Sequence, residues 1–455
     1  MTRAFIIAGT SSRAGKTTIT AGIVSLLVQR GFTVQTYKTG PDYIDPAYHQ
    51  LASGRPCYNL DTWMMGKDGV VQTFYSHLDS VDFAVIEGVM GLFDGKSQAH
   101  DMPKGIYAGS TAHLACVLEL PVILIVDATA TAQSVGAVVL GFKSYIRELN
   151  LLAGVVFNNV AGKRHYELLL EGVMRAGIPV IGYLPKDTML NLPERHLGLL
   201  PPEENAHLKE MRQRLGEVLD STVNMPLLMS LTKTVTNHEA AQVEKRKCHN
   251  TAIRIGIALD EAFWFYYQEN FDILKKAGME LVFFSPLKEQ KVPAGVNALY
   301  FGGGYPEIYA ESLSGNTSMM HSIRQYAYDG GCIYAECGGF MLLTEGMYNL
   351  EGNYFEMAGL FKTRTKMSKT HLKLGYREVE LLEDMPLGRR GERLRGHEFH
   401  YSHLESAPEN AQDIYNNDAR GFRIMKVFAS YVHVHFGSRQ DVGEHFACFL
   451  TSSDS

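Results

Sequence analysis

The sequence predicts an α/β protein built from two α/β domains, and three observations carry this prediction. Short apolar runs alternate with helical patterns in both halves of the chain, which is typical of parallel sheets covered by helices. The length of 455 residues exceeds the size at which one hydrophobic core usually stops growing. A polar stretch without periodicity, residues 231–250, separates the two halves. We therefore expect domains at 1–230 and 251–455, joined by that linker.

The composition is typical of a soluble globular protein. Hydrophobic residues make up 45% of the chain and charged residues 20%, and the formal net charge is −6. A chain of this character is not expected to bind nucleic acid or a membrane surface, and no apolar run is long enough to span a bilayer. Six cysteines without a CxxC pair argue against a zinc or disulfide framework and favour a reducing cytoplasm.

The first domain is predicted to open with a strand at residues 3–9 and a helix at 16–31 that ends at a glycine. Four further apolar runs, each followed by turn residues, are strand candidates, at 32–38, 83–89, 121–128 and 151–160. Runs that are apolar throughout are typical of parallel strands with helices on both faces. We therefore predict a doubly wound parallel sheet, followed by a polar helix at 205–220.

The loop between the first strand and the first helix, "GTSSRAGKTT", predicts a phosphate-binding site. Backbone N–H groups of such a P-loop bind phosphate oxygens, Lys16 reaches the outer phosphates, and the hydroxyl group of Thr17 binds Mg²⁺. The spacing is G-x5-G-K-T, because Thr10 stands where the standard motif has glycine, and this variant resembles dethiobiotin synthetase. The nucleotide-binding candidates are Gly9, Thr10, Gly15, Lys16, Thr17 and Thr18.

Acidic residues follow two other predicted strands of this sheet. Glu87 stands at the end of "FAVIE", and Asp42 and Asp45 follow the strand at 32–38. Ligands of an open α/β sheet bind beyond the carboxyl ends of its strands. We therefore assign Glu87 to Mg²⁺ or to a catalytic water, and Asp42 and Asp45 to metal binding or substrate orientation. The alternatives are a solvated glutamate at a strand end and two aspartates that form a turn beside proline.

The second domain repeats the alternation, with strand candidates at 253–260, 280–285, 298–304 and 332–339. Cys337 stands where the last run turns into a predicted helix, "GFMLLTEG". A nucleophile on such a strained turn needs small neighbours, which Ala335 and Gly339 provide. A helix N-terminus also lowers the pKa of a thiol, so we expect Cys337 to favour the thiolate. The alternative is a small core cysteine.

A base and an oxyanion site for that cysteine are available elsewhere in the domain. "FASYVHVHFGS" is predicted to be a strand that carries His433 and His435 on one face, because side chains repeat every two residues. The turn "FGGGYPE" offers backbone N–H groups, those of Gly302 and Gly303, that could stabilise an oxyanion. A cysteine, a histidine and a glycine turn together predict acyl transfer from an amide. The strand pattern alone does not choose between the two histidines.

Nine segments in this order resemble the cobyrinate a,c-diamide synthase family. The resemblance implies an ATPase domain like that of dethiobiotin synthetase, fused to a class I glutamine amidotransferase domain. It also implies an activity, the amidation of the a and c acetate carboxylates of cobyrinate with ATP, Mg²⁺ and glutamine or ammonia, in cobalamin biosynthesis. The segments are "GTSSRAGKTT", "KTGPDYIDP", "NLDTWM", "VIEGVMGLFDG", "LPERHLGL", "FGGGYPE", "ECGGFMLL", "RGHEFHYS" and "SYVHVHF".

The implied mechanism has two halves. A carboxylate reacts with ammonia only when its oxygen becomes a leaving group, which ATP supplies by phosphorylation. Lys16 and Mg²⁺ would stabilise the transferring phosphoryl group, with Asp45 and Glu87 as further catalytic residues. Cys337 would release ammonia from glutamine through a thioester, and the ammonia would attack the acyl phosphate.

The resemblance also bears on the identity of the base. Cobyric acid synthases end the corresponding strand in T-Y-x-H-G, and its first four positions match Ser430 to His433, with serine in place of threonine. This match favours His433 over His435. Amidotransferases of this class usually follow the base with proline and glutamate, and the glutamate orients the histidine. This chain has "HVHFGS" instead, and the resembled family also lacks the glutamate and works as a Cys–His pair, so the sequence does not identify what orients the imidazole.

The implied substrate is a corrinoid polycarboxylate. Two basic segments, 362–373 and 388–400, could clamp its carboxylates, although a solvated surface position is the alternative for any single residue. We count as substrate-binding candidates Asp94 in "VIEGVMGLFDG" and Arg395 and His397 in "RGHEFHYS". The expected partners are ATP, glutamine and this polycarboxylate, and the chain itself is expected to be a monomer or a homodimer.

Two other functions compete with this one. The same a,c-diamidation could act on hydrogenobyrinate or on nickel sirohydrochlorin, because the motifs separate these macrocycles poorly. A more distant alternative is a P-loop switch ATPase with an inactive second domain. Such a switch would have no need of Cys337, His433 or the glycine turn, so we favour the enzyme.

Overall fold

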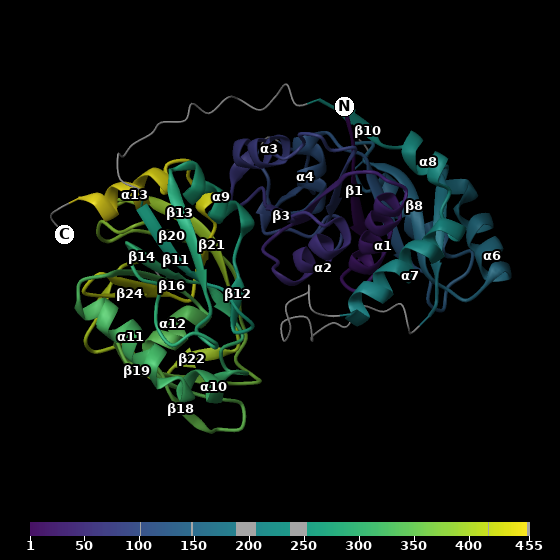
Figure 1. The fold of residues 1–455 in the computed structure, drawn as a ribbon. Helices are drawn as coiled ribbons and strands as arrows, with labels where there is room; N and C mark the ends of the chain where they lie inside the picture. Colours follow the sequence, from purple (N-terminus) through teal and green to yellow (C-terminus); the bar gives the residue numbers. More distant parts are fainter. Residues whose placement is uncertain (101, 147–148, 188–205, 237–252, 417, 453–455) are drawn as a thin grey trace. The chain divides into compact units, whose positions relative to one another are not determined.

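The computed structural model describes residues 1–100, 102–146, 149–187, 206–236, 253–416 and 418–452 (Figure 1). The described residues divide into two compact units, one that ends by residue 236 and one that starts at residue 253. Each unit is an α/β fold around a mainly parallel sheet, which confirms the predicted fold class. In these ranges, no helix is both long and apolar enough to cross a membrane.

The first unit is built on an eight-stranded sheet of order β3-β2-β4-β1-β7-β8-β9, with β10 beside the start of β1. Every described strand of this sheet except β10 runs parallel to its neighbours, as the sequence predicted. The strands are β1 Thr2–Gly9, β2 Val34–Thr39, β3 Tyr58–Leu60, β4 Phe83–Glu87, β7 Val122–Asp127, β8 Leu152–Val160, β9 Val180–Pro185 and β10 Lys233–Val235.

Helices cover this sheet and bury both faces of its central strand. Phe5 and Ile7 of β1 pack in one apolar core with α1, α2, α7 and α8, while Ala4, Ile6 and Ala8 point to the other face and are equally buried. This two-sided burial explains why the strand is apolar throughout. The helices are α1 Lys16–Gln29, α2 Ile44–Ser53, α3 Gly66–Ser76, α4 Thr111–Leu118, α5 Val135–Ser144, α6 Lys163–Val173, α7 Ala206–Thr222 and α8 Met225–Ser230.

The first residues of the predicted linker belong to the sheet of the first unit. Residues Lys233–Val235 form β10 and pair with Thr2 to Ala4 of β1 in antiparallel register. The first unit therefore continues past residue 230. The remainder of the predicted linker, from residue 237 onward, lies outside the described residues.

The second unit contains a seven-stranded sheet of order β13-β11-β14-β16-β25-β24-β23. The first five strands run parallel to one another, β24 is antiparallel to β25, and β23 is antiparallel to β24. Helices α9 (Gln268–Lys276), α10 (Ala310–Gly315), α11 (Thr317–Tyr328), α12 (Gly338–Leu343) and α13 (Val442–Thr451) accompany it. The strands are β11 Ile253–Ala258, β13 Met279–Phe284, β14 Ala298–Phe301, β16 Cys332–Glu336, β23 Gln412–Asp413, β24 Gly421–Ile424 and β25 Val427–Ser430.

Smaller sheets of the second unit carry the remaining motifs. One has the order β20-β21-β26, one the order β18-β17-β19-β22, and a short pair joins β12 and β15. The strands are β12 Phe263–Phe265, β15 Gly303–Gly304, β17 Thr344–Tyr348, β18 Tyr354–Glu356, β19 Phe361–Met367, β20 Lys373–Glu380, β21 Arg393–His400, β22 Ser402–Leu404 and β26 His433–Val434.

The single strand predicted for "FASYVHVHFGS" is interrupted. β25 ends at Ser430, and β26 pairs with β21 in a different sheet. His435 then caps a short 3-10 helix, η6 (Phe436–Ser438), by accepting from the N–H of Gly437. The break lies before both histidines, because the N–H of His435 still donates to the carbonyl oxygen of Arg395 on β21 (3.1 Å) and its backbone is extended, so the prediction that His433 and His435 share one face is not contradicted.

Close contact between α5 and α6 gives a test of the packing of the first unit. A Cβ atom at Gly136 would lie 1.9 Å from the carbonyl oxygen of Gly172, which is backbone and cannot turn away. We expect Gly136→Ala to lower the free energy of unfolding by about 1–3 kcal/mol in urea titrations, as overpacked sites do.

Gly141 on the same helix is the matched control, because a Cβ atom there meets nothing within 4 Å. Gly141→Ala should leave stability unchanged or raise it by up to about 1 kcal/mol, since alanine favours helix. Equal effects of the two substitutions would contradict the close helix contact.

Candidate functional site

The phosphate loop of the first unit depends on a glycine in a left-handed conformation. Gly15 has φ 91° immediately before α1, and a Cβ atom there would lie 2.0 Å from Nδ2 of Asn158. That amide group donates a hydrogen bond to the carbonyl oxygen of Ala14 (3.1 Å). The structure thus places Asn158 behind the loop, where it holds the turn that presents the start of α1.

Lys16 is buried in this loop, and its ammonium group lies against backbone oxygens. Nζ donates to the carbonyl oxygens of Ser11 (3.0 Å) and Met90 (2.6 Å). Burial lowers the pKa of Lys16, and the nearby carboxylate of Glu87 offsets part of this effect. Of the other predicted loop residues, Thr10 donates its N–H to Ile125, and Thr18 is half-buried on α1.

Glu87 is the centre of the charged site at the carboxyl edge of the sheet. Its side chain is fully buried at the end of β4, next to the loop that follows β1. Oε1 accepts from the hydroxyl group of Thr17 (2.9 Å) and from Nζ of Lys38 (3.0 Å). Oε2 lies 2.5 Å from Nε2 of His49. One carboxylate therefore joins the P-loop, β2 and α2.

The charge balance keeps this carboxylate ionised. Burial alone would raise the pKa of Glu87, but attraction to Lys38 and His49 outweighs it and lowers the pKa. Burial would likewise lower the pKa of Lys38, yet Asp45, whose Oδ2 lies 2.7 Å from Nζ, and Glu87 together raise it. The two ions are stable in the interior because each neutralises the other.

Helix α2 delivers the remaining groups of this site. Oδ1 of Asp42 accepts from the N–H groups of Ile44 and Asp45 at the start of the helix, and its Oδ2 lies 3.9 Å from Nζ of Lys38. Burial and the neighbouring Asp45 carboxylate raise the pKa of Asp42. Sequence reasoning missed His49, although it stands four residues after Asp45, a spacing that places both on one helix face.

The donors at this edge suit a magnesium ion bound to a nucleotide. Thr17, Glu87, Asp42 and Asp45 offer hydroxyl and carboxylate oxygens, which are the ligands that Mg²⁺ prefers. Asp94 lies further out, and its Oδ2 accepts from the N–H of Gly91 (2.8 Å) in the loop after β4. This exposed carboxylate contributes to the field at Lys16.

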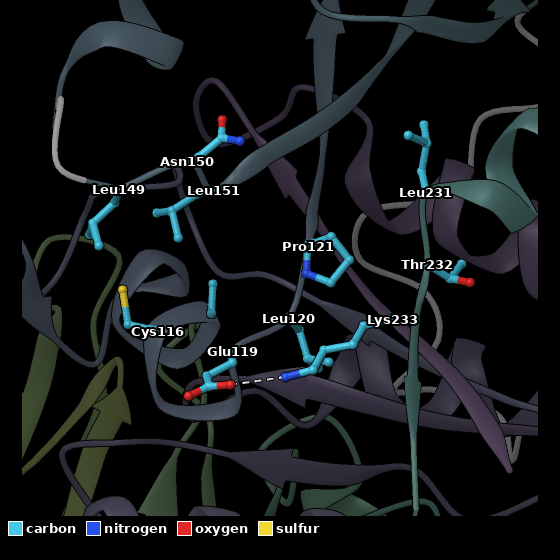
Figure 2. Close-up of a pocket in the computed structure, with 11 residues that line it drawn as sticks. Cys116, Glu119, Leu120, Pro121, Leu149, Asn150, Leu151, Leu231, Thr232 and Lys233 are labelled. Carbon is cyan, nitrogen blue, oxygen red and sulfur yellow. Dashed lines mark hydrogen bonds and ion pairs between the residues drawn. The ribbon is translucent and has the colours of Figure 1, made fainter.

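A pocket of about 500 Å³ lies at the opposite end of the parallel strands, where their amino ends meet (Figure 2). It is lined by residues just before β7, β8 and β10, among them Pro121, Leu151 and Thr232. Glu119 and Lys233 form an ion pair across it at 3.0 Å. Because ligands of open α/β sheets bind at the carboxyl ends of the strands, we do not assign the chemistry to this pocket.

In the second unit, Cys337 occupies a strained turn between β16 and α12. Its backbone has φ 47° and ψ −103°, a conformation that non-glycine residues rarely adopt. Its N–H donates to the carbonyl oxygen of Ser430 (2.8 Å), and a Cβ atom at Gly339 would lie 2.5 Å from the carbonyl oxygen of Phe301. Of the two small neighbours that the sequence predicted, Gly339 is therefore required by the packing.

His433 lies against the glycine turn of the same site. A Cβ atom at Gly303 would lie 2.3 Å from Cε1 of the His433 ring, so only glycine leaves room for the imidazole. A Cβ atom at Gly338, the residue after the cysteine, would lie 3.2 Å from the N atom of Gly304. The cysteine turn, the glycine turn and His433 thus meet in one place.

One of the predicted oxyanion donors is already engaged. The N–H of Gly302 donates to the hydroxyl oxygen of Tyr266 (2.8 Å), and its carbonyl oxygen accepts from Gly339 (2.9 Å). This corrects the expectation for Gly302, because an N–H committed to a tyrosine is not available to a substrate. Sequence spacing could not show it, since Tyr266 lies 36 residues earlier.

The two substrate candidates of "RGHEFHYS" lie in this unit as well. His397 is buried, bonds the hydroxyl group of Tyr267 through Nδ1 (2.8 Å) and stacks on His433, with ring centroids 5.0 Å apart. Arg395 is half-buried, and its Nε donates to Glu378 (2.7 Å). The structure therefore brings His397 to the cysteine–histidine site rather than to an exposed surface.

Burial disfavours the charged forms of both reacting groups of this site. Burial, with the negative charge of Glu307, raises the pKa of the Cys337 thiol. Burial, with the neighbouring His397 and His400, lowers the pKa of His433 well below its ordinary value. The structure does not favour the thiolate expected at a helix N-terminus, because burial raises the pKa of Cys337 and the hydrogen bond from the N–H of Gly338 lowers it only in part.

Two family models match the chain. The CobQ/CobB/MinD/ParA nucleotide binding domain matches residues 5–200, and the CobB/CobQ-like glutamine amidotransferase domain matches residues 254–441. Both candidate sites fall within these matches.

Three known proteins named cobyrinate a,c-diamide synthase are similar to this chain over nearly its whole length. That of Caldanaerobacter subterraneus subsp. tengcongensis is 41% identical over 441 residues, which cover 95% of each chain. That of Dehalococcoides mccartyi strain CBDB1 is 40% identical over 97% of this chain and 96% of the relative. That of Listeria innocua serovar 6a is 40% identical over 95% and 96%, respectively.

The buried position of Glu87 predicts a loss of stability when its charge is removed. Glu87→Gln leaves Lys38 buried with Asp45 as a remaining partner. We therefore expect the free energy of unfolding, measured in urea at pH 7, to fall by about 3 kcal/mol. Because folding lowers the pKa of Glu87, this stabilisation is present above the unfolded value of 4.5 and is lost in acid. The difference between the proteins should therefore shrink below pH 4.5.

Glu119→Gln is the matched control. Glu119 pairs with Lys233, but its side chain is 81% exposed, and such surface pairs contribute less than about 1 kcal/mol. If both amides behaved alike, the Glu87 cluster would not be the buried charge network described above.

Proposed function

The chain belongs to the cobyrinate a,c-diamide synthase family, and from this premise we propose that it amidates the a and c acetate carboxylates of cobyrinate, using ATP and glutamine. The observation that carries the proposal is the strained turn at Cys337, which lies beside a glycine turn that packs against His433, in a chain that also has a phosphate loop. An ATPase without amide chemistry would have no use for that second site.

The first half of the proposed reaction activates the carboxylate. A carboxylate oxygen of the macrocycle attacks the γ-phosphorus of ATP, the new oxygen–phosphorus bond forms, and the bond to ADP breaks. Lys16 stabilises the charge on the phosphoryl oxygens, since it lies at the start of α1 among the loop carbonyls. Asp45 acts with Lys38 to orient the substrate, which its 2.7 Å ion pair supports.

Thr17, Glu87 and Asp42 are the residues that we propose to hold Mg²⁺. When bound, the ion neutralises charge on the phosphate oxygens and orients the nucleotide. The hydrogen bond from Thr17 to Glu87 already brings a hydroxyl and a carboxylate together at the end of the P-loop (2.9 Å). Glu87 keeps its charge there because Lys38 and His49 lower its pKa, and an ionised carboxylate is the form that binds a cation.

The second half supplies nitrogen. His433 removes the thiol proton as Sγ of Cys337 attacks the carboxamide carbon of glutamine, and it returns the proton to the leaving nitrogen, which departs as ammonia. Water then hydrolyses the thioester to glutamate. Neutral His433 is the competent base, and its lowered pKa keeps it neutral at physiological pH.

Stabilisation of the tetrahedral intermediate is assigned to backbone groups. We propose the N–H of Gly303, together with that of Gly338, the residue that follows the nucleophile. The close approach of Gly338 to the glycine turn supports this pair. The ammonia released then attacks the carbonyl carbon of the acyl phosphate, phosphate leaves with the bonding electrons, and loss of a proton completes the amide.

The remaining features of the function are also proposals. Asp94 and Arg395 stay candidates for binding the carboxylates of the macrocycle, whereas the contacts of His397 favour a role beside His433. We propose the cytoplasm as the compartment, since the five cysteines that the structure describes form no disulfide. We propose a monomer or a homodimer, which light scattering would distinguish.

The macrocycle is tested directly. Purified protein with ATP, Mg²⁺ and glutamine should convert cobyrinate to its diamide, as observed by mass spectrometry. Efficient diamidation of hydrogenobyrinate or nickel sirohydrochlorin, with cobyrinate unreacted, would overturn the proposed substrate and leave the chemistry intact.

Lys16→Ala tests the first half. Because activation precedes attack by nitrogen, we expect amidation to fall on the order of a thousandfold with either glutamine or ammonium as the nitrogen donor. Release of glutamate from glutamine should persist in the absence of the macrocycle, since that site is separate. Near-normal amidation by the variant would show that the ATP site lies elsewhere.

Cys337→Ser tests the second half. Glutamine-dependent amidation should disappear, while amidation with added ammonium salt should stay within a few-fold of the wild-type rate, because only nitrogen supply is lost. His433→Ala should reproduce this pattern and His435→Ala should not, since His435 caps η6. If Cys337→Ser lost amidation with both glutamine and ammonium, Cys337 would be a core residue rather than the nucleophile.

A further inference from the structure

We propose that Glu336 is a positioning residue for glutamine hydrolysis, because its buried carboxylate fixes the strand that carries His433 relative to the turn that carries Cys337. The inference rests on the proposed function of the cysteine site and deepens it. It answers the question raised by "HVHFGS", in which the glutamate that usually orients the base is missing.

The contacts of Glu336 join two separate parts of the fold. It is the last residue of β16 and stands directly before Cys337. Oε1 accepts from the backbone N–H of Val434 at 2.9 Å, and Val434 is the residue after His433 on β26. This hydrogen bond joins residues that lie 98 positions apart in the sequence, next to both the nucleophile and the base.

Two tyrosines hold the carboxylate in place. The hydroxyl group of Tyr334 donates to Oε1 (2.7 Å), and that of Tyr300 donates to Oε2 (2.9 Å). The side chain is 1% exposed, so it exchanges no hydrogen bonds with bulk solvent. With three donors around two oxygens, Glu336 has one well-defined orientation.

β26 needs such an anchor because it is only two residues long. Its ladder with β21 comprises the pairs Gly396–Val434 and His397–His433. The N–H of Val434 is held by Glu336, and its carbonyl oxygen is held by Asn270 (3.0 Å). Without an acceptor, the buried N–H of Val434 would lose a hydrogen bond, and the strand would shift to recover one.

The imidazole is then oriented by packing on an anchored backbone. His397 stacks on one side of the ring, and Gly303 leaves space for Cε1. A shift of β26 would change the distance and angle between His433 and Cys337, to which the rate of proton transfer is sensitive. In other amidotransferases of this class the glutamate acts on the ring, whereas Glu336 acts on the strand.

The charge of Glu336 is not what this role requires. Burial raises its pKa to about 7, and the hydrogen bonds from Tyr334 and Val434 limit that rise. Either protonation state leaves Oε1 able to accept from Val434. A neutral residue of the same shape with an acceptor oxygen should therefore replace Glu336, while one without an acceptor should not.

The test compares three substitutions in the full-length chain, with glutaminase kinetics as the readout. Glu336→Leu keeps the volume and removes the acceptor, and we expect kcat to fall about 100-fold with KM within about threefold, as for a reacting group displaced by about 1 Å. Glu336→Gln keeps an acceptor and should stay within about threefold of wild type. Ammonium-dependent amidation should be unchanged in all variants.

Glu336→Asp covers the case in which the leucine variant does not fold. The aspartate is small and charged, but its shorter side chain cannot reach both the Val434 N–H and the two tyrosines, so kcat should fall about tenfold. Ile333→Val in the same buried strand is the stability control, and its kcat should match wild type. This control separates a loss of positioning from a general loosening of β16.

Several outcomes would overturn the inference. They are wild-type kcat in Glu336→Leu or Glu336→Asp, a glutamine variant as impaired as the leucine variant, or a rise in KM with kcat unchanged. The proposed function fails separately, if Cys337→Ser keeps glutamine hydrolysis. Loss of hydrolysis in Cys337→Ser with normal kcat in Glu336→Leu would therefore refute only the role of Glu336.

Discussion

The cost of burying a carboxylate organises both halves of this molecule. Each unit ends a central strand with a glutamate that is almost wholly inaccessible to water, Glu87 on β4 and Glu336 on β16. A carboxylate in such a place must find donors within the protein. The donors that it gathers come from elements far apart in sequence, so the requirement of one side chain fixes the relative position of several segments around each reacting centre.

The same residue type serves two purposes because its partners differ. Around Glu87 the partners are Lys38 and His49, whose attraction lowers the pKa and preserves a negative charge suited to a cation. Around Glu336 they are tyrosine hydroxyl groups and a backbone N–H, which hydrogen-bond the carboxylate without a counter-charge, and its pKa rises to about 7. The first carboxylate is an electrostatic element of a phosphate site, and the second is a structural connector.

Sequence patterns predicted the secondary structure and the motifs of the protein better than its tertiary contacts. The apolar strands, the P-loop and the turn at Cys337 were predictable, because local periodicity and small neighbours leave a direct trace in the sequence. The break between β25 and β26 was not, since "SYVHVHF" reads as one alternating strand and only pairing with β21 separates its halves. The engagement of Gly302 by Tyr266 and the link from Glu336 to Val434 join residues 36 and 98 positions apart. Such contacts arise from tertiary packing, which no local pattern encodes.

The pairing of β10 with β1 has a mechanical consequence. β10 runs antiparallel to β1, with Val235 opposite Thr2, so the chain leaves the first unit at the amino end of β1, whereas the P-loop follows Gly9 at the other end. Tension applied through residue 236 would separate the three residue pairs of this short ladder one after another, starting with Thr2 and Val235. We expect β1, which supports the nucleotide loop, to be loaded only after that, because β4 pairs with it from Arg3 to Ile7 and β7 from Ile6 to Gly9. We therefore expect the β10–β1 ladder to separate before the strand that leads into the phosphate loop is disturbed.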